Sequence, residues 1–282
     1  MDSRLTLERR IEAEVMSYDG KMGIYLDDFR GNVIAVHEEE AFETASAIKT
    51  FILACLFAEV EKGNKSLEDM LEYKEEHEVD GSGVLCALEP GAMLRVKDAA
   101  TFMIIVSDNI ATNMMIDYLG LDTINRSIKA LGCKNTVLYN PIHFDKYHRL
   151  GTSTPRDYAS IFTRLAKGEL ISRTADEKML AIFKKQHYNS MITKDFPPYY
   201  MDSDNTDDIL ITVASKSGSM DACRNDGGLV FTPYGPYAIV MFHKGFSDAM
   251  YYPAHPATVF GAKVSRMILD QFLALEGKFL DH

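Results

Sequence analysis

The sequence lacks an excess of basic residues, a long apolar run and closely spaced cysteines. Its 30 Lys and Arg residues stand against 41 Asp and Glu residues, and the net charge of −11 repels nucleic-acid phosphates and anionic lipid surfaces. The longest strictly apolar run, residues 51–58, is far shorter than the roughly 20 residues that span a bilayer. Residues 1–20 contain no apolar stretch of the kind found in a signal peptide. We therefore expect a soluble, cytoplasmic protein that binds neither nucleic acid nor membrane.

Chemistry based on cysteine, metal or cofactor is also unsupported by the sequence. The four cysteines lie far apart without a CxxC pair, so we interpret them as free thiols: Cys55, Cys86, Cys133 and Cys223. The HExxH, P-loop and GxGxxG patterns are absent. The sequence therefore predicts a protein that needs neither a metal nor another cofactor.

The hydrophobic pattern places strands at both ends of the chain and helices between them. With 282 residues and 46% hydrophobic content, the chain can bury a large core. Runs rich in β-forming residues predict strands, and apolar residues at helical spacing predict helices. The expected strands are 22–28 and 32–37 as a hairpin, then 208–216, 228–232 and 237–243; the expected helices are 46–62, 109–118, 122–131, 155–167, 174–186 and 257–276.

We expect the strands from the two ends to form one sheet, because neither set alone would bury both of its faces. The sequence thus predicts an α+β fold of two packed lobes. Residues 1–40 and 207–282 would form a discontinuous α/β lobe, and residues 41–206 would form an all-α lobe. A cleft between the two lobes would hold the active site.

The start of the predicted helix 46–62 carries a possible nucleophile and base. Ser46 and Lys49 form an SxxK motif, and this spacing places both side chains on one face of a helix. Burial lowers the pKa of a lysine until its neutral amine can accept a proton from a serine hydroxyl. The alternative is that Ser46 is a helix N-cap and Lys49 a solvated side chain, since about one SxxK is expected by chance in such a chain.

Two further motifs favour the catalytic interpretation. The tripeptide Ser107-Asp108-Asn109 lies between helical segments, and Lys216-Ser217-Gly218 lies at the end of a predicted strand. Each has a structural alternative, because Ser107 can cap a helix and Lys216 can protect an edge strand from aggregation. The chance that all three motifs occur together in this order is below roughly one in a hundred.

In these motifs the chain resembles the class A β-lactamases and penicillin-binding proteins, for which SxxK, SDN and K[ST]G are diagnostic. The resemblance covers about residues 11–275 and includes four further segments: Gly81–Leu85, Pro90-Gly91, Ile105–Asn113 and Thr152–Pro155. It implies a serine β-lactamase-like fold, with a five-stranded antiparallel sheet flanked by helices and an all-α lobe. The sheet predicted from the hydrophobic pattern has the same number of strands.

The resemblance also implies a role for each residue of the motifs. Ser46 would be the acylated nucleophile, Lys49 its proton acceptor and Ser107 a proton relay to the leaving nitrogen. Substrate binding and the oxyanion hole would use the backbone N–H groups of Ser46 and Ser219 and the residues Asn109, Lys216, Ser217, Gly218 and Arg224. Arg224 would be a second cation for a substrate carboxylate, with a surface arginine as the alternative.

One segment departs from the family pattern. Class A enzymes carry a deacylating glutamate before the TxxP segment, whereas residues 136–155 contain no glutamate and make a loop about four residues shorter. His143, Asp145 and His148 are candidates for a replacement base, or for a metal site through the two histidines. The alternative is that they are solvated loop residues.

The sequence therefore predicts a cofactor-independent serine hydrolase that cleaves a small carboxylate-bearing β-lactam, amide or ester through a Ser46 acyl-enzyme. A β-lactamase, a peptidase and an esterase all remain open, and serine glutaminases share the SxxK motif. The alternative from another class is a binding or sensor module that captures acyl compounds without turnover. A missing deacylation base is compatible with both.

Overall fold

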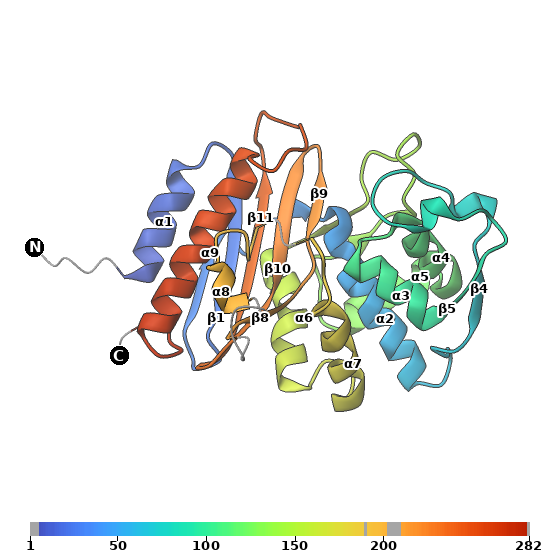
Figure 1. Ribbon diagram of the computed structural model, residues 1–282, viewed down its shortest axis with the longest axis horizontal. Coiled ribbons are helices and arrows are strands. Elements are labelled where there is room, and N and C mark those ends of the chain that lie inside the picture. The colour runs from blue at the N-terminus through green and yellow to red at the C-terminus, as the bar shows by residue number, and fades with distance from the viewer. Residues whose placement is uncertain (1–5, 189–190, 202–209, 281–282) are drawn as a thin grey trace, which may run out of the picture.

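The computed structural model describes residues 6–188, 191–201 and 210–280. Its main sheet is antiparallel and joins strands from both ends of the chain, as the sequence predicts (Figure 1). Within the described residues the strand order is β2-β1-β11-β10-β8, and β9 also pairs with β10. The strands are β1 (Lys21–Asp27), β2 (Val33–Val36), β8 (Thr212–Ser215), β9 (Gly218–Met220), β10 (Cys223–Thr232) and β11 (Gly235–Lys244).

The sheet differs from the prediction on the side of β10. The strand expected at 228–232 begins earlier, at Cys223. The prediction missed this start because residues 223–227 are buried but polar or small, so the sequence shows no apolar run there. β10 pairs first with β9 and then with β8, and Lys216 and Ser217 lie in the break between these two strands. Residues 208 and 209 of the expected strand 208–216 lie outside the described residues.

The predicted helices are confirmed with small shifts at their ends. They are α2 (Lys49–Glu61), α4 (Asn109–Leu119), α5 (Leu121–Ala130), α6 (Pro155–Lys167), α7 (Arg173–Phe183) and α9 (Pro256–Ala274). The structure adds α3 (Val96–Ile105) and α8 (Pro198–Met201), for which no bounds were predicted. The short 3₁₀ helices are η1 (Ala45–Ile48), η2 (Glu75–His77) and η3 (Leu85–Ala87).

A helix at the N-terminus was not predicted. In α1 (Leu7–Ser17), Leu7, Ile11 and Val15 recur at helical spacing and are buried. Thr6 caps the helix by accepting a hydrogen bond from the backbone N–H of Arg9. Both signals are present in the sequence, since a Thr cap precedes an apolar stripe with a spacing of four.

The segment 41–206 is mostly helical, and it also holds a few very short strands. Among the described residues it contains a small sheet of β3 (Phe42–Glu43), β7 (Gly151–Ser153) and β6 (Val137–Leu138), and a pair of β4 (Met70–Glu72) and β5 (Met93–Arg95). Strands of two or three residues are too short to show an alternating pattern. The division into lobes at residues 40 and 207 remains a prediction.

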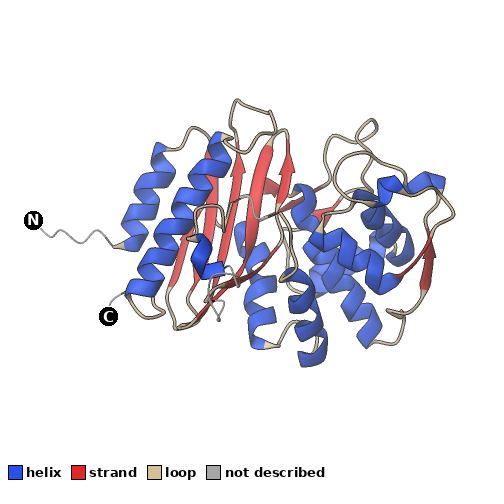
Figure 2. Cartoon of the chain, viewed as in Figure 1, coloured by secondary structure: helices blue, strands red, loops and turns tan. Residues whose placement is uncertain are grey.

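The main sheet buries both faces against helices (Figure 2). Alternate residues of β11 face opposite sides: Val240 and Phe242 pack with the helices of the segment 41–206, whereas Ile239 and Met241 pack with α1 and α9. None of the helices in the described part of the chain combines the length and apolar character needed to cross a bilayer. The four cysteines are free, as predicted.

Candidate active site

The turn that carries Ser46 lies between β3 and α2. Ser46 belongs to η1, and Lys49 is the first residue of α2. The N-cap positions of these helices are Thr44 and Ile48, so Ser46 is not a helix cap. Ala45 has a φ of 45°, which non-glycine residues rarely adopt and which is typical of strained functional sites. The surrounding structure therefore holds Ser46 in a specific position.

Strand β9 lies directly against this turn. A Cβ atom at Gly218 would lie 2.4 Å from the carbonyl oxygen of Thr44 and 2.9 Å from the backbone nitrogen of Ser46. Any side chain at position 218 would push the strand away. Glycine therefore allows Ser219 to approach Ser46, and both residues line one cleft.

The ammonium group of Lys49 is fully buried and points at the SDN motif. Its Nζ lies 2.6 Å from the carbonyl oxygen of Ser107, 3.1 Å from Ser107 Oγ and 2.8 Å from Asn109 Oδ1. Burial lowers the pKa of Lys49 well below its usual value, and the nearby charge of Lys216 lowers it further, against the opposing effect of Asp108. A lysine in this environment can become a neutral base.

Ser107 is shared between two buried lysines. Its Oγ accepts from Lys49 Nζ and from Lys216 Nζ, each at 3.1 Å, and its backbone has a positive φ of 53°. Lys216 Nζ also donates to the carbonyl oxygen of Ser217 at 2.6 Å. The hydroxyl of Ser107 is thus placed to exchange protons with either amine.

Lys216 reaches this position from the break in the sheet. The hydroxyl of Tyr158 in α6 donates to the carbonyl oxygen of Lys216 at 2.7 Å and so fixes its backbone. Burial lowers the pKa of Lys216 to about 7, while the charge of Asp226 acts in the opposite direction. The same burial raises the pKa of Asp226 to about 7. Lys216 therefore titrates near neutral pH.

The central residue of the SDN motif has a structural role. Asp108 accepts hydrogen bonds from the backbone N–H groups of Val84 at 2.6 Å, Leu85 at 2.9 Å and Ala111 at 2.8 Å. A Cβ at Gly83 would lie 2.3 Å from Asp108 Oδ2, so this contact requires glycine. Asp108 thereby fastens the segment 81–85 to the start of α4.

Asn109 lines the cleft, but both ends of its amide already have partners. Its Oδ1 accepts from Lys49, and its Nδ2 donates to the carbonyl oxygen of Asp80 at 3.0 Å. In this state Asn109 positions the lysine and the adjacent loop. A hydrogen bond to substrate, as the family resemblance implies, would share or replace one of these contacts.

The cleft in front of Ser46 has a volume of about 610 Å³. Its walls come from the start of α4 at Asn109, the loop after β6, strand β9 and the segment after β11. The lining residues are Ala45, Ser46, Gly81, Ser82, Asn109, Ile142, Phe144, Leu150, Ser219, Met220, Asp221 and Tyr251. Among these described residues only Asp221 carries a carboxylate, and its side chain lies on the exposed rim.

The structure separates the candidate replacement bases from the cleft. Ile142 lines only the cleft and Phe144 lies between the two spaces, whereas His143 and Asp145 line only the neighbouring cavity. His148 is exposed and lines neither space. That His143 and Asp145 border a different space from Ser46 was not apparent from the sequence. In this geometry none of the three is placed to activate a water at Ser46.

Buried Asn113 and partly buried Glu43 fix the same loop. Asn113 accepts from the backbone N–H of Ile142 at 2.8 Å and donates to its carbonyl oxygen at 3.0 Å. Glu43 Oε1 accepts from the N–H groups of Leu150 at 3.1 Å and Gly151 at 3.0 Å. Neither role was predicted, although Asn113 follows Asn109 by one helical turn and therefore lies on the same face.

The carboxylate-binding role that the resemblance implies for Arg224 remains a prediction. Arg224 is buried, and its guanidinium donates to the carbonyl oxygens of Met220, Cys223, Ala249 and Met250. Like Lys216 and Ser217, it is not among the residues that line the cleft. Four of its five N–H donors are thus used by the backbone.

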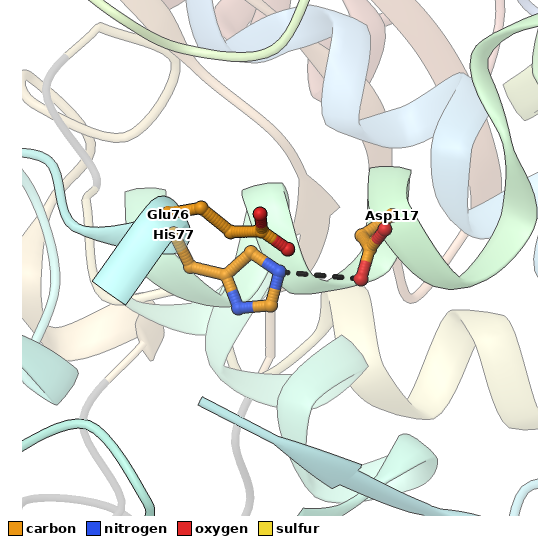
Figure 3. A group of neighbouring side chains, drawn as sticks. All are labelled: Glu76, His77 and Asp117. Atoms are coloured by element: carbon orange, nitrogen blue, oxygen red, sulfur yellow. Dashed lines mark ion pairs between the residues drawn. The ribbon is translucent and has the colours of Figure 1, made fainter. Parts of the chain in front are cut away.

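A group of potential metal ligands outside the cleft is an ion-pair cluster (Figure 3). Glu76, His77 and Asp117 lie close together, and His77 Nε2 lies 3.4 Å from Asp117 Oδ2. The Nδ1 atom of His77 accepts from the backbone N–H of Lys74, which places the proton of the neutral ring on Nε2. A metal would need that Nε2 lone pair, and the ammonium of Lys74 already contacts Asp117 at 2.9 Å and Glu76 at 3.3 Å.

Comparisons with known proteins agree with the fold and the motifs. A model of the β-lactamase enzyme family matches residues 6–272. A β-lactamase from Streptomyces lavendulae is 23% identical over 83% of this chain and 76% of its own length.

The solved structure of a β-lactamase from Sphaerobacter thermophilus superposes with a TM-score of 0.82 at 26% identity, covering 94% of this chain and 97% of that chain. PBP-A superposes equally well, with a TM-score of 0.82 at 27% identity and coverages of 95% and 96%. A mutant of PBP-A has been solved as an acyl-enzyme complex with penicillin G.

Proposed function

Because the chain belongs to the β-lactamase enzyme family, we propose that it is a serine hydrolase that opens a β-lactam, amide or ester through an acyl-enzyme on Ser46. One observation supports this proposal more strongly than any other. Two buried lysines, Lys49 and Lys216, converge on the hydroxyl of Ser107 beside the strained turn of Ser46. A purely structural arrangement would gain little from burying two amines together, because each loses its hydration.

Acylation follows from these positions. Neutral Lys49 accepts the proton of Ser46, directly or through a water, while the Ser46 oxygen bonds to the substrate carbonyl carbon. The backbone N–H groups of Ser46 and Ser219 stabilise the oxyanion. When the bond to the leaving group breaks, Ser107 donates its proton to the leaving atom and takes a proton back through Lys49. The net result is an ester on Ser46 and a protonated leaving group.

Deacylation lacks a comparable device. Ile142 lies at the cleft on the segment that lacks a glutamate, and His143 and Asp145 line the neighbouring cavity instead. A β-lactam leaves its ring-derived amine attached to the acyl group, which shields the ester from water. A simple ester releases its alcohol, so water reaches the acyl-enzyme more easily.

We therefore expect a stoichiometric burst followed by slow turnover with a chromogenic cephalosporin, and sustained hydrolysis of a short-chain chromogenic ester. Stopped-flow absorbance with known enzyme concentration measures both phases. Rapid steady-state cephalosporin hydrolysis without a burst would contradict the account of deacylation. A burst with both substrates and no turnover of either would instead favour the acyl-capturing sensor module.

We also propose that Lys216 and Ser217 bind a substrate carboxylate. Lys216→Met removes the charge at similar size and should reduce kcat/KM for a carboxylate-bearing substrate about 10- to 100-fold more than for an uncharged ester. Lys244→Met, on a partly exposed lysine that pairs with Glu40, is the matched control. Equal losses on both substrates would show that Lys216 acts only on the chemical step.

The binding of a substrate carboxylate by Lys216 should also depend on pH. The ammonium form of Lys216 is present below its pKa of about 7 and is lost as the pH rises through this value. We therefore expect KM for the carboxylate-bearing substrate to increase above about pH 7, relative to KM for the uncharged ester. Parallel pH profiles of KM for the two substrates would oppose this assignment.

A further inference from the structure

We propose that Arg224 is a positioning residue that holds Tyr251 as one wall of the cleft, and that this wall selects substrates with an aromatic acyl group. The inference rests on the proposed acyl transfer for its assay. The wall itself consists of described contacts that are independent of the reaction.

The guanidinium of Arg224 contacts the segment that precedes Tyr251. Its NH2 group donates to the carbonyl oxygens of Ala249 at 3.2 Å and Met250 at 3.0 Å, which directly precede Tyr251. Its NH1 group donates to the carbonyl oxygens of Met220 and Cys223. Arg224 thus ties the segment 249–251 to β9 and β10. A lysine has three donors without the planar fork and cannot replace these four contacts.

Two aromatic rings lie near the guanidinium of Arg224. Its guanidinium carbon lies 4.4 Å from the centroid of the Tyr251 ring and 5.3 Å from that of Phe246. At these distances a cation is attracted to the face of an aromatic ring. The backbone contacts therefore place the segment, and the cation–π contact orients the ring of Tyr251.

Two exposed aromatic side chains lie at the cleft. Tyr251 and Phe144 both line it, and in the free protein they are 60% and 47% exposed. Ile142, Leu150 and Met220 line the same space. An apolar ring that packs against this wall would remove exposed aromatic surface from water, and aromatic pairs add a geometric preference beyond the buried area.

This wall contacts the acyl group of the substrate. Ser107 protonates the leaving group in the proposed reaction, so the leaving group lies toward Ser107 and Lys216. The acyl substituent must then extend along the remaining walls of the cleft. These walls carry Tyr251 beside β9 and Phe144 in the loop after β6.

The test compares two nitrophenyl esters that share a leaving group, the phenylacetate and the acetate. We expect the ratio of their kcat/KM values to fall about 5- to 10-fold in Tyr251→Ala and in Arg224→Met, and to be retained in Tyr251→Phe. Tyr252→Ala is the matched control, because Tyr252 is adjacent and exposed but does not line the cleft. An unchanged ratio in Tyr251→Ala would overturn the proposal.

Two further readouts separate positioning from anion binding. Arg224→Lys keeps the charge, so a cation that binds carboxylates would be partly rescued, whereas the positioning role predicts the same loss as Arg224→Met. Hydrogen exchange of the amides at 249–251 should become faster in both variants. Unchanged exchange, or a loss confined to carboxylate-bearing substrates, would contradict the positioning role. If the parent protein acylates with neither ester, the proposed function itself fails.

Discussion

Lys49→Arg should slow acylation of Ser46 by at least about 100-fold, the usual scale for loss of a positioned base. Arginine keeps the positive charge, but its guanidinium does not release a proton at working pH. The structure makes Lys49 suitable for this role because burial lowers its pKa and its contacts direct it to the SDN motif. Single-turnover kinetics with a chromogenic cephalosporin measure the acylation rate directly.

Folding must be checked in this experiment, since position 49 is fully buried and arginine is larger. Lys49→Met provides a variant of similar length without a base and should show the same loss. Lys62→Arg, at the exposed end of the same helix, is the matched control and should leave the rate unchanged. A folded Lys49→Arg or Lys49→Met protein that acylates at the parent rate would remove Lys49 from the mechanism.

Ile142→Glu should increase β-lactam turnover by about 100-fold, the lower end of the effect of a general base. The backbone of Ile142 is fixed by Asn113 through both its N–H and its carbonyl oxygen, and its side chain faces the cleft that contains Ser46. Burial at this position would raise the pKa of the new carboxyl group, which favours proton transfer near neutral pH. Steady-state hydrolysis of a cephalosporin after the burst measures the effect.

Two variants isolate the base from other effects of the substitution. Ile142→Gln has nearly the same shape without a base and should leave turnover slow. His143→Glu places a carboxylate one residue further on, where the side chain faces the neighbouring cavity, and should also leave it slow. Equal turnover in Ile142→Glu and Ile142→Gln would show that water access, not a missing base, limits deacylation.

The parts of the fold that the sequence predicted are those with a regular hydrophobic period. The sheet from both chain ends belongs to this group, and the central helix α2 could be predicted because it is apolar nearly all round and has neither Gly nor Pro. Strands such as β3 and β7 have two or three residues and owe their pairing to the turn of Ser46 that lies beside them. Their pattern is too short to be detected.

The site divides in a similar way. Ser46, Lys49, Ser107 and Lys216 could be predicted because each belongs to a compact motif, and the structure places Lys49 and Lys216 on the same Ser107 hydroxyl. Arg224 was given a role from its spacing alone. Its actual partners are carbonyl oxygens of the segment 249–250, which is distant in the sequence, and no local pattern reports such a contact.

The loop after β6 shows a further limit. The sequence showed that residues 136–155 lack a glutamate, but it could not show which side chains face Ser46. That depends on Asn113 and Glu43, which hold the two ends of the loop by hydrogen bonds to its backbone. Such contacts are formed with any side chain in the loop and leave no trace in its composition.

The central claim is that Ser46 becomes acylated, and intact-protein mass spectrometry tests it most directly. After incubation with a penicillin, the parent protein should show a single adduct of the mass of the intact penicillin, mapped to Ser46 by peptide analysis. Ser46→Ala should show no adduct, whereas Ser82→Ala, which alters another serine of the same cleft, should still be labelled. An adduct that persists in Ser46→Ala, or that maps to a different residue of the parent protein, would contradict the account.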